Sequence, residues 1–545
     1  MADNVQNTSP ASSTVALAAP AAPRTLRWKP FVVVVSGLIV AILAVRAGFE
    51  EIAQVTTAVG ILVIALITLV WFFVRAGFSS QVRWAGLAVL IGTSAIAWTS
   101  GVRFAGFRGA MWPDFYIAGG RTKDLAEFPA ATPSVQPPDV RVDIVPTSHD
   151  YPGFLGPDRN ATIKGLRLAR DWKATPPKEL WRIPVGLGWS SFAIVGNLAV
   201  TQEQRGPDEL VVAYELQTGK EVWKHADKTL FSEALGGNGP RATPTFKEGR
   251  IFALGATGVL NCLEAETGKL VWSRDILKDA GAKNIIWGMS GSPLVYDHFV
   301  VVNPGGGNGY SVVAYDTRTG QMVWHGGSGQ AAYSSPLLAT LAGVRQVVIL
   351  NGPGLEAYSA EDGRELWNFD WKTSDDQMIS VSQPVVLPAA DGHPDRILIS
   401  SGYTKGAALL EITGTPDKLQ ANQLWRTKKL RAKFTNVVVR DGFVYGLDET
   451  ILACVDLKDG TPAWRRERAA QYDYGQVMLI DDVILVQAES GDVALVSATP
   501  EKFQELTRFS PLGNKTWNNP ALSGRLLLVR NDREAVCCEL PLAGE

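Results

Sequence analysis

Apolar and polar residues alternate in short runs along most of the chain, and turn signals separate the runs. In "VVAYELQTGKEVWKH" (211–225), one alternating run meets a Thr-Gly pair and a second run that contains Trp. Alternation on both sides of such a pair predicts a β-hairpin with the Gly at positive φ. The pattern recurs in NCLEAETGKLVWSRD (261–275), VVAYDTRTGQMVWHG (312–326), LEAYSAEDGRELWNF (355–369) and LACVDLKDGTPAWRR (452–466).

A Trp stands four residues after the turn Gly in each of these hairpins. The five residues are Trp223, Trp272, Trp324, Trp367 and Trp464. Trp181 and Trp425 end similar strands that lack a good turn before them, and an eighth strand of this type (503–510) has no Trp. We expect these Trp side chains to pack as wedges between neighbouring repeat units.

A second landmark lies between successive Trp strands: a small or polar pair, usually with Pro, followed by an apolar strand. It occurs at 189–192, 241–244, 290–293, 333–336, 381–384, 434–437, 474–477 and 517–520. Each unit is therefore predicted to be a four-stranded antiparallel sheet, and eight such sheets predict an all-β, eight-bladed β-propeller over 179–542. Strand 179–183 has no partner before it and strand 533–542 has none after it, so their pairing closes the ring. Two stacked sandwiches or a seven-bladed ring are the alternatives.

Continuous apolar runs replace the alternation near the N-terminus, at 31–45, 55–74 and 84–98. Because a bilayer core requires ~20 apolar residues in a helix, the runs and their flanks predict three transmembrane α-helices; buried core helices are the alternative. Lys and Arg before the first run and in the second loop predict a cytoplasmic N-terminus. We expect a disordered tail (1–28), an inner-membrane anchor (29–102), an extracytoplasmic connector (103–178) and a propeller on the periplasmic side.

Charge and motif content point away from several functions. The net charge is −2 and no basic block is present, so no nucleic-acid partner is predicted. The five His are scattered without metal-ligand spacing, and no nucleophile motif occurs, so we predict no metal site and no catalytic residue. Glu203, Asp208 and Glu449 are interpreted as solvated charges in loops.

The recurring Thr-Gly-x-x-x-Trp pattern resembles the pyrroloquinoline-quinone (PQQ) repeat propellers. The resemblance covers about 179–542 and is specific for the fold. The family includes quinoprotein alcohol dehydrogenases and BamB-like lipoproteins of outer-membrane protein assembly, which carry no quinone. A BamB resemblance implies a lipidated N-terminal Cys, but the first Cys here is Cys262, within the predicted propeller.

The quinoprotein resemblance implies bound PQQ, Ca²⁺ held by carboxylate and amide oxygens, a catalytic Asp and often a vicinal disulfide. Cys537 and Cys538 are adjacent, but neighbouring side chains of a strand point to opposite faces. Cys262, Cys454 and Cys537 also share one repeat position with Ala213, Ala314 and Ala357, which is typical of a tight packing site. We therefore predict no cofactor and keep PQQ with Ca²⁺ as the alternative.

Aromatic residues are enriched at the first position of the landmark, which precedes the innermost strand of each blade. The eight residues are Trp189, Arg241, Ser290, Tyr333, Val381, Phe434, Tyr474 and Trp517, and Trp287 lies close by in sequence. Equivalent positions in a propeller meet at one mouth of the central channel. The aromatic residues are either core that plugs the channel or a ligand mouth in which Arg241 orients an acidic or carbonyl group. We predict a non-catalytic, BamB-like binding module with a protein or peptide partner in the cell envelope; a quinoprotein oxidoreductase is the alternative.

Overall fold

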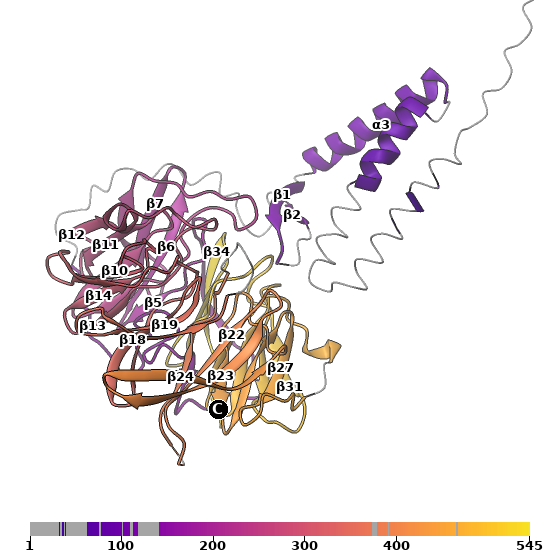
Figure 1. Ribbon diagram of the computed structural model, residues 1–545. Coiled ribbons are helices and arrows are strands. Elements are labelled where there is room, and N and C mark those ends of the chain that lie inside the picture. Colours follow the sequence, from indigo (N-terminus) through magenta and orange to yellow (C-terminus); the bar gives the residue numbers. More distant parts are fainter. Residues whose placement is uncertain are drawn as a thin grey trace, which may run out of the picture. The chain divides into compact units, whose positions relative to one another are not determined.

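The computed structural model describes residues 32, 35–36, 39, 63–75, 78–100, 102–109, 113–117, 141–372, 379–390, 392–464 and 467–544. The chain divides into two compact units, Met1–Thr99 and Ser100–Glu545. Figure 1 shows helices in the first unit and mainly strands in the second.

The N-terminal unit contains a helix over 63–70 that continues into the π-helix η1 (Trp71–Arg75), followed by α3 (Ser80–Thr99). The third predicted membrane span lies in α3, whereas the first span and residues 55–62 of the second fall largely or wholly outside the described residues. Within the described part of the chain, no helix combines the length and the apolar character needed to cross a bilayer. The structure therefore does not support the three predicted transmembrane helices.

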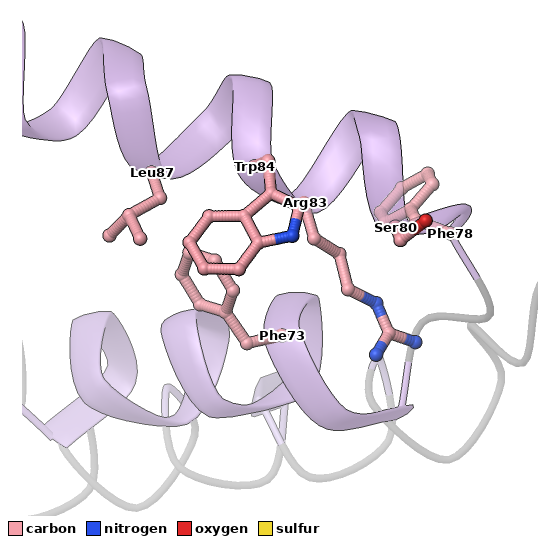
Figure 2. Close-up of a pocket in the computed structure, with 6 residues that line it drawn as sticks. All are labelled: Phe73, Phe78, Ser80, Arg83, Trp84 and Leu87. Carbon is pink, nitrogen blue, oxygen red and sulfur yellow. The ribbon is translucent and has the colours of Figure 1, made fainter.

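A pocket of about 450 Å³ lies in this unit, at the N-terminal half of α3. Figure 2 shows the Trp84 indole on α3 facing the Phe73 ring on the preceding helix. The lining residues are Phe73, Phe78, Ser80, Arg83, Trp84 and Leu87.

The described part of the second unit contains the two-stranded sheet of β1 (Val102–Phe107) and β2 (Pro113–Ile117), and eight larger sheets that follow one another in chain order. The predicted all-β, eight-bladed propeller is thereby confirmed, and the sandwich and seven-bladed alternatives are wrong. In Figure 1 the colours run around the ring from magenta through orange to yellow. Within a blade, each strand pairs antiparallel with the strand before it and the strand after it, so every blade is a meander.

The first four blades contain these strands: β5 (Ala193–Val195), β6 (Leu198–Arg205), β7 (Asp208–Glu215), β8 (Glu221–Asp227); β9 (Thr245–Lys247), β10 (Arg250–Leu254), β11 (Val259–Glu264), β12 (Leu270–Asp275); β13 (Leu294–Tyr296), β14 (Phe299–Val302), β15 (Val312–Asp316), β16 (Met322–Gly326); β17 (Leu337–Leu341), β18 (Val344–Leu350), β19 (Gly354–Ser359), β20 (Glu365–Asp370). A short helix, α4 (Ile276–Ala280), follows the second blade.

The last four blades contain these strands: β21 (Val385–Leu387), β22 (Arg396–Ser401), β23 (Gly406–Thr415), β24 (Lys418–Thr427); β25 (Val438–Arg440), β26 (Phe443–Asp448), β27 (Ile451–Asp456); β28 (Gln476–Ile480), β29 (Val483–Gln487), β30 (Val493–Ser497), β31 (Glu505–Phe509); β32 (Ala521–Ser523), β33 (Leu526–Arg530), β34 (Glu534–Glu539), β4 (Lys178–Pro184). A 3-10 turn, η3 (Arg468–Ala470), follows the sixth blade.

Both ends of the propeller sequence meet in the eighth blade. Strand β34 pairs antiparallel with β33 on one side and with β4 on the other, with Cys537 opposite Trp181. The pairing predicted from the unpartnered end strands is therefore present. It leaves no open edge between the first and the last blade.

The blade Trp side chains are buried, as expected for wedges between blades. Their exposed fractions lie between 5% for Trp223 and 9% for Trp272 and Trp425. The full set is Trp181, Trp223, Trp272, Trp324, Trp367, Trp425 and Trp464. The residue opposite each Trp on the neighbouring strand is small in most blades, such as Ala213 opposite Trp223 and Cys262 opposite Trp272.

Among the described residues, which leave out 465–466, the sheet of the sixth blade contains three strands, β25, β26 and β27, whereas the predicted unit has four. The segment that contains Trp464 makes a single bridge between Pro462 and Val455 instead of a fourth strand. The Ala463 and Trp464 N–H groups both donate to the Cys454 carbonyl, so the described part of this segment keeps backbone hydrogen bonds to β27.

The connector crosses the centre of the ring between Tyr151 and β3 (Thr162–Ile163). Tyr151 exchanges backbone hydrogen bonds with Ile194 in the first blade, and the Pro152 carbonyl accepts from the Phe246 N–H in the second. Strand β3 runs parallel to β28 in the seventh blade. The connector therefore contacts innermost strands from blades far apart around the ring.

Candidate functional site

The aromatic landmark residues come together at one end of the ring. The ring centroids of Trp189 and Trp517 are 4.8 Å apart, and Phe434 lies 5.3 Å from both Trp517 and Tyr474. These four residues come from the first, sixth, seventh and eighth blades, so they form one continuous arc. Each precedes an innermost strand, and the common register of the blades puts them at the same height.

A second arc forms on the side of the third, fourth and fifth blades. The Trp287 ring lies 5.2 Å from Tyr333 and 6.5 Å from Tyr403. The Trp287 N–H donates to the Tyr333 hydroxyl oxygen at 3.3 Å. Sequence reasoning missed Tyr403, because it lies in a turn between β22 and β23 rather than at the landmark position.

Lys433 connects the two arcs. Its ammonium lies 5.0 Å from the Tyr403 ring centroid and 4.5 Å from that of Tyr474. Lys515 lies within the first arc, with its ammonium 4.9 Å from the Trp189 ring centroid and 4.5 Å from that of Trp517. Burial lowers the pKa of Lys515, and the ring faces supply an attraction for its cationic form. The only sequence signal for either Lys is its place beside a landmark aromatic residue. We call these two Lys and the seven aromatic residues of both arcs the mouth cluster.

Arg241 has a different environment from the predicted one. Its guanidinium lies 4.5 Å from the Phe231 ring centroid and donates to the carbonyls of Gly237 and Gly239. Burial lowers its pKa to about 10. Its hydrogen bonds hold the loop of Gly237 and Gly239, and this loop also meets the cluster because the Trp189 indole N–H donates to the Gly236 carbonyl at 2.5 Å.

Two carboxylates hold aromatic side chains of the cluster in place. Glu489 Oε1 accepts from the Trp517 indole N–H at 2.9 Å, and Glu449 Oε2 accepts from the Tyr474 hydroxyl at 3.4 Å. Burial raises the pKa of Glu449 and of Tyr474. The cluster therefore combines flat apolar faces with ammonium donors and carboxylate acceptors.

Arg159 lies across the ring centre, where the connector passes. Its guanidinium donates to the carbonyls of Ser292 and Pro293, at 3.1 Å each, in the third blade. Its own carbonyl accepts from the Gln383 side-chain amide at 2.5 Å in the fifth blade. Together with the contacts of Tyr151 to the first blade and of β3 to the seventh, these contacts place the connector among the innermost strands of the ring.

Seven of the eight landmark positions are partly exposed, and Tyr474 alone is buried, at 4%. The alternative that the landmark residues are core side chains, buried against each other, therefore does not hold for seven of the eight positions. Their contacts with one another are an observation, and their role in binding remains a prediction.

Comparisons with known proteins agree with this geometry. Residues 207–466 match the family model described as "Outer membrane protein assembly factor BamB". The protein of that name from Yersinia pestis is 26% identical over 280 residues, covering 48% of this chain and 67% of that protein. Its counterpart from Shewanella oneidensis is 26% identical over 327 residues, covering 52% and 79%. Over residues 207–466 the repeat domain is similar to the BamB family, and its eight-bladed propeller fits that resemblance.

A solved structure of the PQQ-type propellers shares the fold. The quinohemoprotein alcohol dehydrogenase from Comamonas testosteroni superposes with a TM-score of 0.55 at 13% identity, covering 73% of this chain and 81% of that one. At this identity the likeness shows the fold alone.

The mouth cluster of this propeller does not fit the PQQ and Ca²⁺ ligands that the quinoprotein resemblance implies. The carboxylates at the cluster, Glu449 and Glu489, are engaged with Tyr474 and Trp517. In the part of the chain that the structure describes, no group of three His, Cys, Asp or Glu side chains is placed to hold a metal ion. The adjacent Cys537 and Cys538 are free thiols within β34, in the sheet of the eighth blade.

The structure corrects the interpretation of two carboxylates as solvated loop charges. Glu203 lies in β6 and Asp208 begins β7, and both are fully buried. Glu203 accepts from Arg205 and from the Tyr214 hydroxyl, and Asp208 pairs with Lys228 at 2.9 Å. The sequence did not reveal this, because Tyr214 lies on β7 and Lys228 follows β8, so both come close to these carboxylates only in the folded blade.

Proposed function

We propose that this chain is a non-catalytic binding module that acts, like its BamB relatives, in outer-membrane protein assembly, and that the mouth cluster binds a protein or peptide segment. The observation that carries the proposal is the cluster itself, with most of its aromatic faces partly exposed at one end of the ring. Clustered aromatic side chains with access to solvent are typical of recognition surfaces.

The mixture of charges supports a polypeptide partner over other classes. Lys433 and Lys515 are donors, and Glu449 and Glu489 are acceptors, within the same cluster. A peptide main chain presents both N–H donors and carbonyl acceptors, so it satisfies both kinds of group. A nucleic acid requires a basic surface, and the chain has a net charge of −2.

Replacing Trp189 and Trp517 with Ala tests the proposal. The purified chain captures its partner from detergent-solubilised cell envelopes, and the partner is then identified and titrated. Because truncation of a binding hot spot costs about 2 kcal/mol or more, we expect affinity to fall at least about thirty-fold. Leu424→Ala is the matched control, since Leu424 is 48% exposed on the outer strand β24. Equal affinity of the double variant and the control would contradict the proposal.

A second part of the proposal is that the mouth cluster does not bind a quinone. It is supported by the poor fit of Glu449 and Glu489 to a Ca²⁺ site, as both are engaged by aromatic side chains. The absorbance and mass spectrum of the purified protein, before and after addition of PQQ and Ca²⁺, test this part. Saturable reconstitution of alcohol oxidation would favour the quinoprotein function instead.

We also propose that the N-terminal unit anchors the chain in the inner membrane, with the propeller on the periplasmic side. The three apolar runs support this, as do the large apolar side chains that α3 exposes, including Trp84 at 69% and Ile96 at 66%. Exposed apolar surface of this extent requires a cover. A reporter that is active only in the cytoplasm, fused after residue 110, is expected to stay silent in cells, and strong activity would contradict the orientation.

A further inference from the structure

The tip of an N-terminal hairpin lies on the mouth cluster. Strand β1 (Val102–Phe107) pairs antiparallel with β2 (Pro113–Ile117), and the tip between them reaches the propeller. The Gly109 N–H donates to Glu489 Oε1 at 2.7 Å. The Lys515 ammonium donates to the Phe107 carbonyl at 3.1 Å. The tip thus engages the cluster through its main chain.

Gly109 packs directly on the Tyr474 ring. A Cβ at this position would lie 2.1 Å from Tyr474 Cδ2 and 2.6 Å from Cγ, distances at which no side chain fits. Gly109 is itself buried, and Tyr474 is the one landmark residue of the eight that is buried. The difference between Tyr474 and the other seven positions therefore follows from the hairpin that covers it.

Two further contacts fix this arrangement. Glu489 Oε1 accepts from both the Gly109 N–H and the Trp517 indole N–H, so the hairpin shares an acceptor with the cluster. Within the hairpin, Arg108 Nε donates to Asp114 Oδ1 at 3.0 Å, and the Asp114 side chain is 5% exposed. This ion pair joins Arg108, the residue before Gly109, to β2.

We propose that the mouth cluster is a receptor for a glycine-bearing turn, and that the hairpin tip occupies it as a competitor carried by the chain itself. The mouth cluster recognises three features of such a turn. A backbone N–H donates to Glu489, a backbone carbonyl accepts from Lys515, and a residue without a side chain packs on the Tyr474 ring. A partner segment that binds here presents the same three features and displaces the tip. The statement about the partner rests on the proposed function, whereas the occupancy by the tip does not.

Competition by a tethered segment has a measurable consequence. An occupant on the same chain acts at an effective concentration that reaches the millimolar range for short linkers. The apparent affinity for any external turn is therefore reduced by the fraction of molecules in which the cluster is open. Removing the tip from the cluster is expected to strengthen binding of an external turn.

Gly109→Leu in the full chain tests the proposal, because a branched side chain cannot fit against Tyr474. The probe is a fluorescent synthetic peptide with the sequence of residues 102–117, titrated by anisotropy. We expect the variant to bind the probe at least ten-fold more tightly than the natural chain. The matched control is Gly307→Leu, at an exposed loop glycine where an added Cβ would have no atom within 4 Å and φ is not positive, which should leave probe affinity unchanged.

Two further measurements complete the test. A probe with Leu in place of its Gly109 equivalent should not bind, and Glu489→Gln in the Gly109→Leu background should weaken the natural probe at least ten-fold. Equal probe affinity for the Gly109→Leu variant and the natural chain, or binding to neither, would overturn the proposal. The two proposals can also fail separately. If the probe binds as expected but the Trp189 and Trp517 double variant still captures its partner, the proposed function is refuted, and the hairpin tip remains the occupant of the mouth cluster.

Discussion

At the scale of single residues, the glycine of each repeated turn has two structural roles. Gly268 has a φ of +69°, which a residue with a side chain adopts at a cost. A Cβ at Gly268 would also lie 2.4 Å from Cε3 of Trp223 in the preceding blade, whose indole N–H donates to the Ala265 carbonyl at 2.8 Å. The same Gly-on-Trp contact joins Gly219 to Trp181, Gly320 to Trp272, Gly363 to Trp324 and Gly460 to Trp425.

Two Gly→Ala substitutions separate these roles. Gly249 has a φ of +74° and no atom within 4 Å of the added Cβ, so Gly249→Ala carries only the left-handed backbone cost of about 1–2 kcal/mol. Gly268→Ala carries that cost plus displacement of the Trp223 indole, a further ~1–3 kcal/mol typical of overpacking. Urea unfolding of the two variants gives the difference directly. Similar midpoints for both would show that the Trp contact adds no constraint.

At the scale of elements, the blades were predictable because their signals are local. Thr-Gly followed by Trp specifies one hairpin within fifteen residues, and its recurrence sets the register of the ring. The sixth blade keeps this turn although Pro462 follows its Gly, because Pro462 still bridges to Val455. The landmark residues were also predictable as a group, because residues at the same position of each repeat lie at the same level along the axis of the ring.

Other elements of the site were not predictable, because they depend on contacts between distant parts of the chain. The hairpin tip at Gly109 meets Glu489 across 380 residues, and nothing in the alternation of residues 102–117 marks that partner. Arg159 crosses the ring centre to reach Ser292, again without a periodic signal. The apolar runs near the N-terminus predicted membrane helices by composition alone, and the described helices there do not meet the length and hydropathy of a membrane span.

At the scale of the whole molecule, closure of the ring depends on β34. This strand lies between β33 and β4, with Val536 opposite Val529 on one side and opposite Arg182 on the other. Because β4 comes from residues before the first blade and β34 from the end of the last, their pairing ties the two ends of the propeller together. Arg182 adds an ion pair to Glu534 at 2.6 Å.

Val536→Pro is expected to open the ring. Val536 is fully buried in β34, and its backbone N–H faces β33, so proline removes a donor from the ladder that holds β34, the strand that carries β4. Val536→Ala is the matched control, because it keeps the N–H and loses only two carbons of apolar packing, about 2 kcal/mol. We expect Val536→Pro to lower the unfolding midpoint more than Val536→Ala does, and to make residues 178–184 sensitive to proteolysis below that midpoint. If the proline variant remains as resistant as the alanine variant, closure of the ring does not depend on the backbone hydrogen bonds that hold β34 in the eighth blade, and the packing of the connector must hold the first and last blades together.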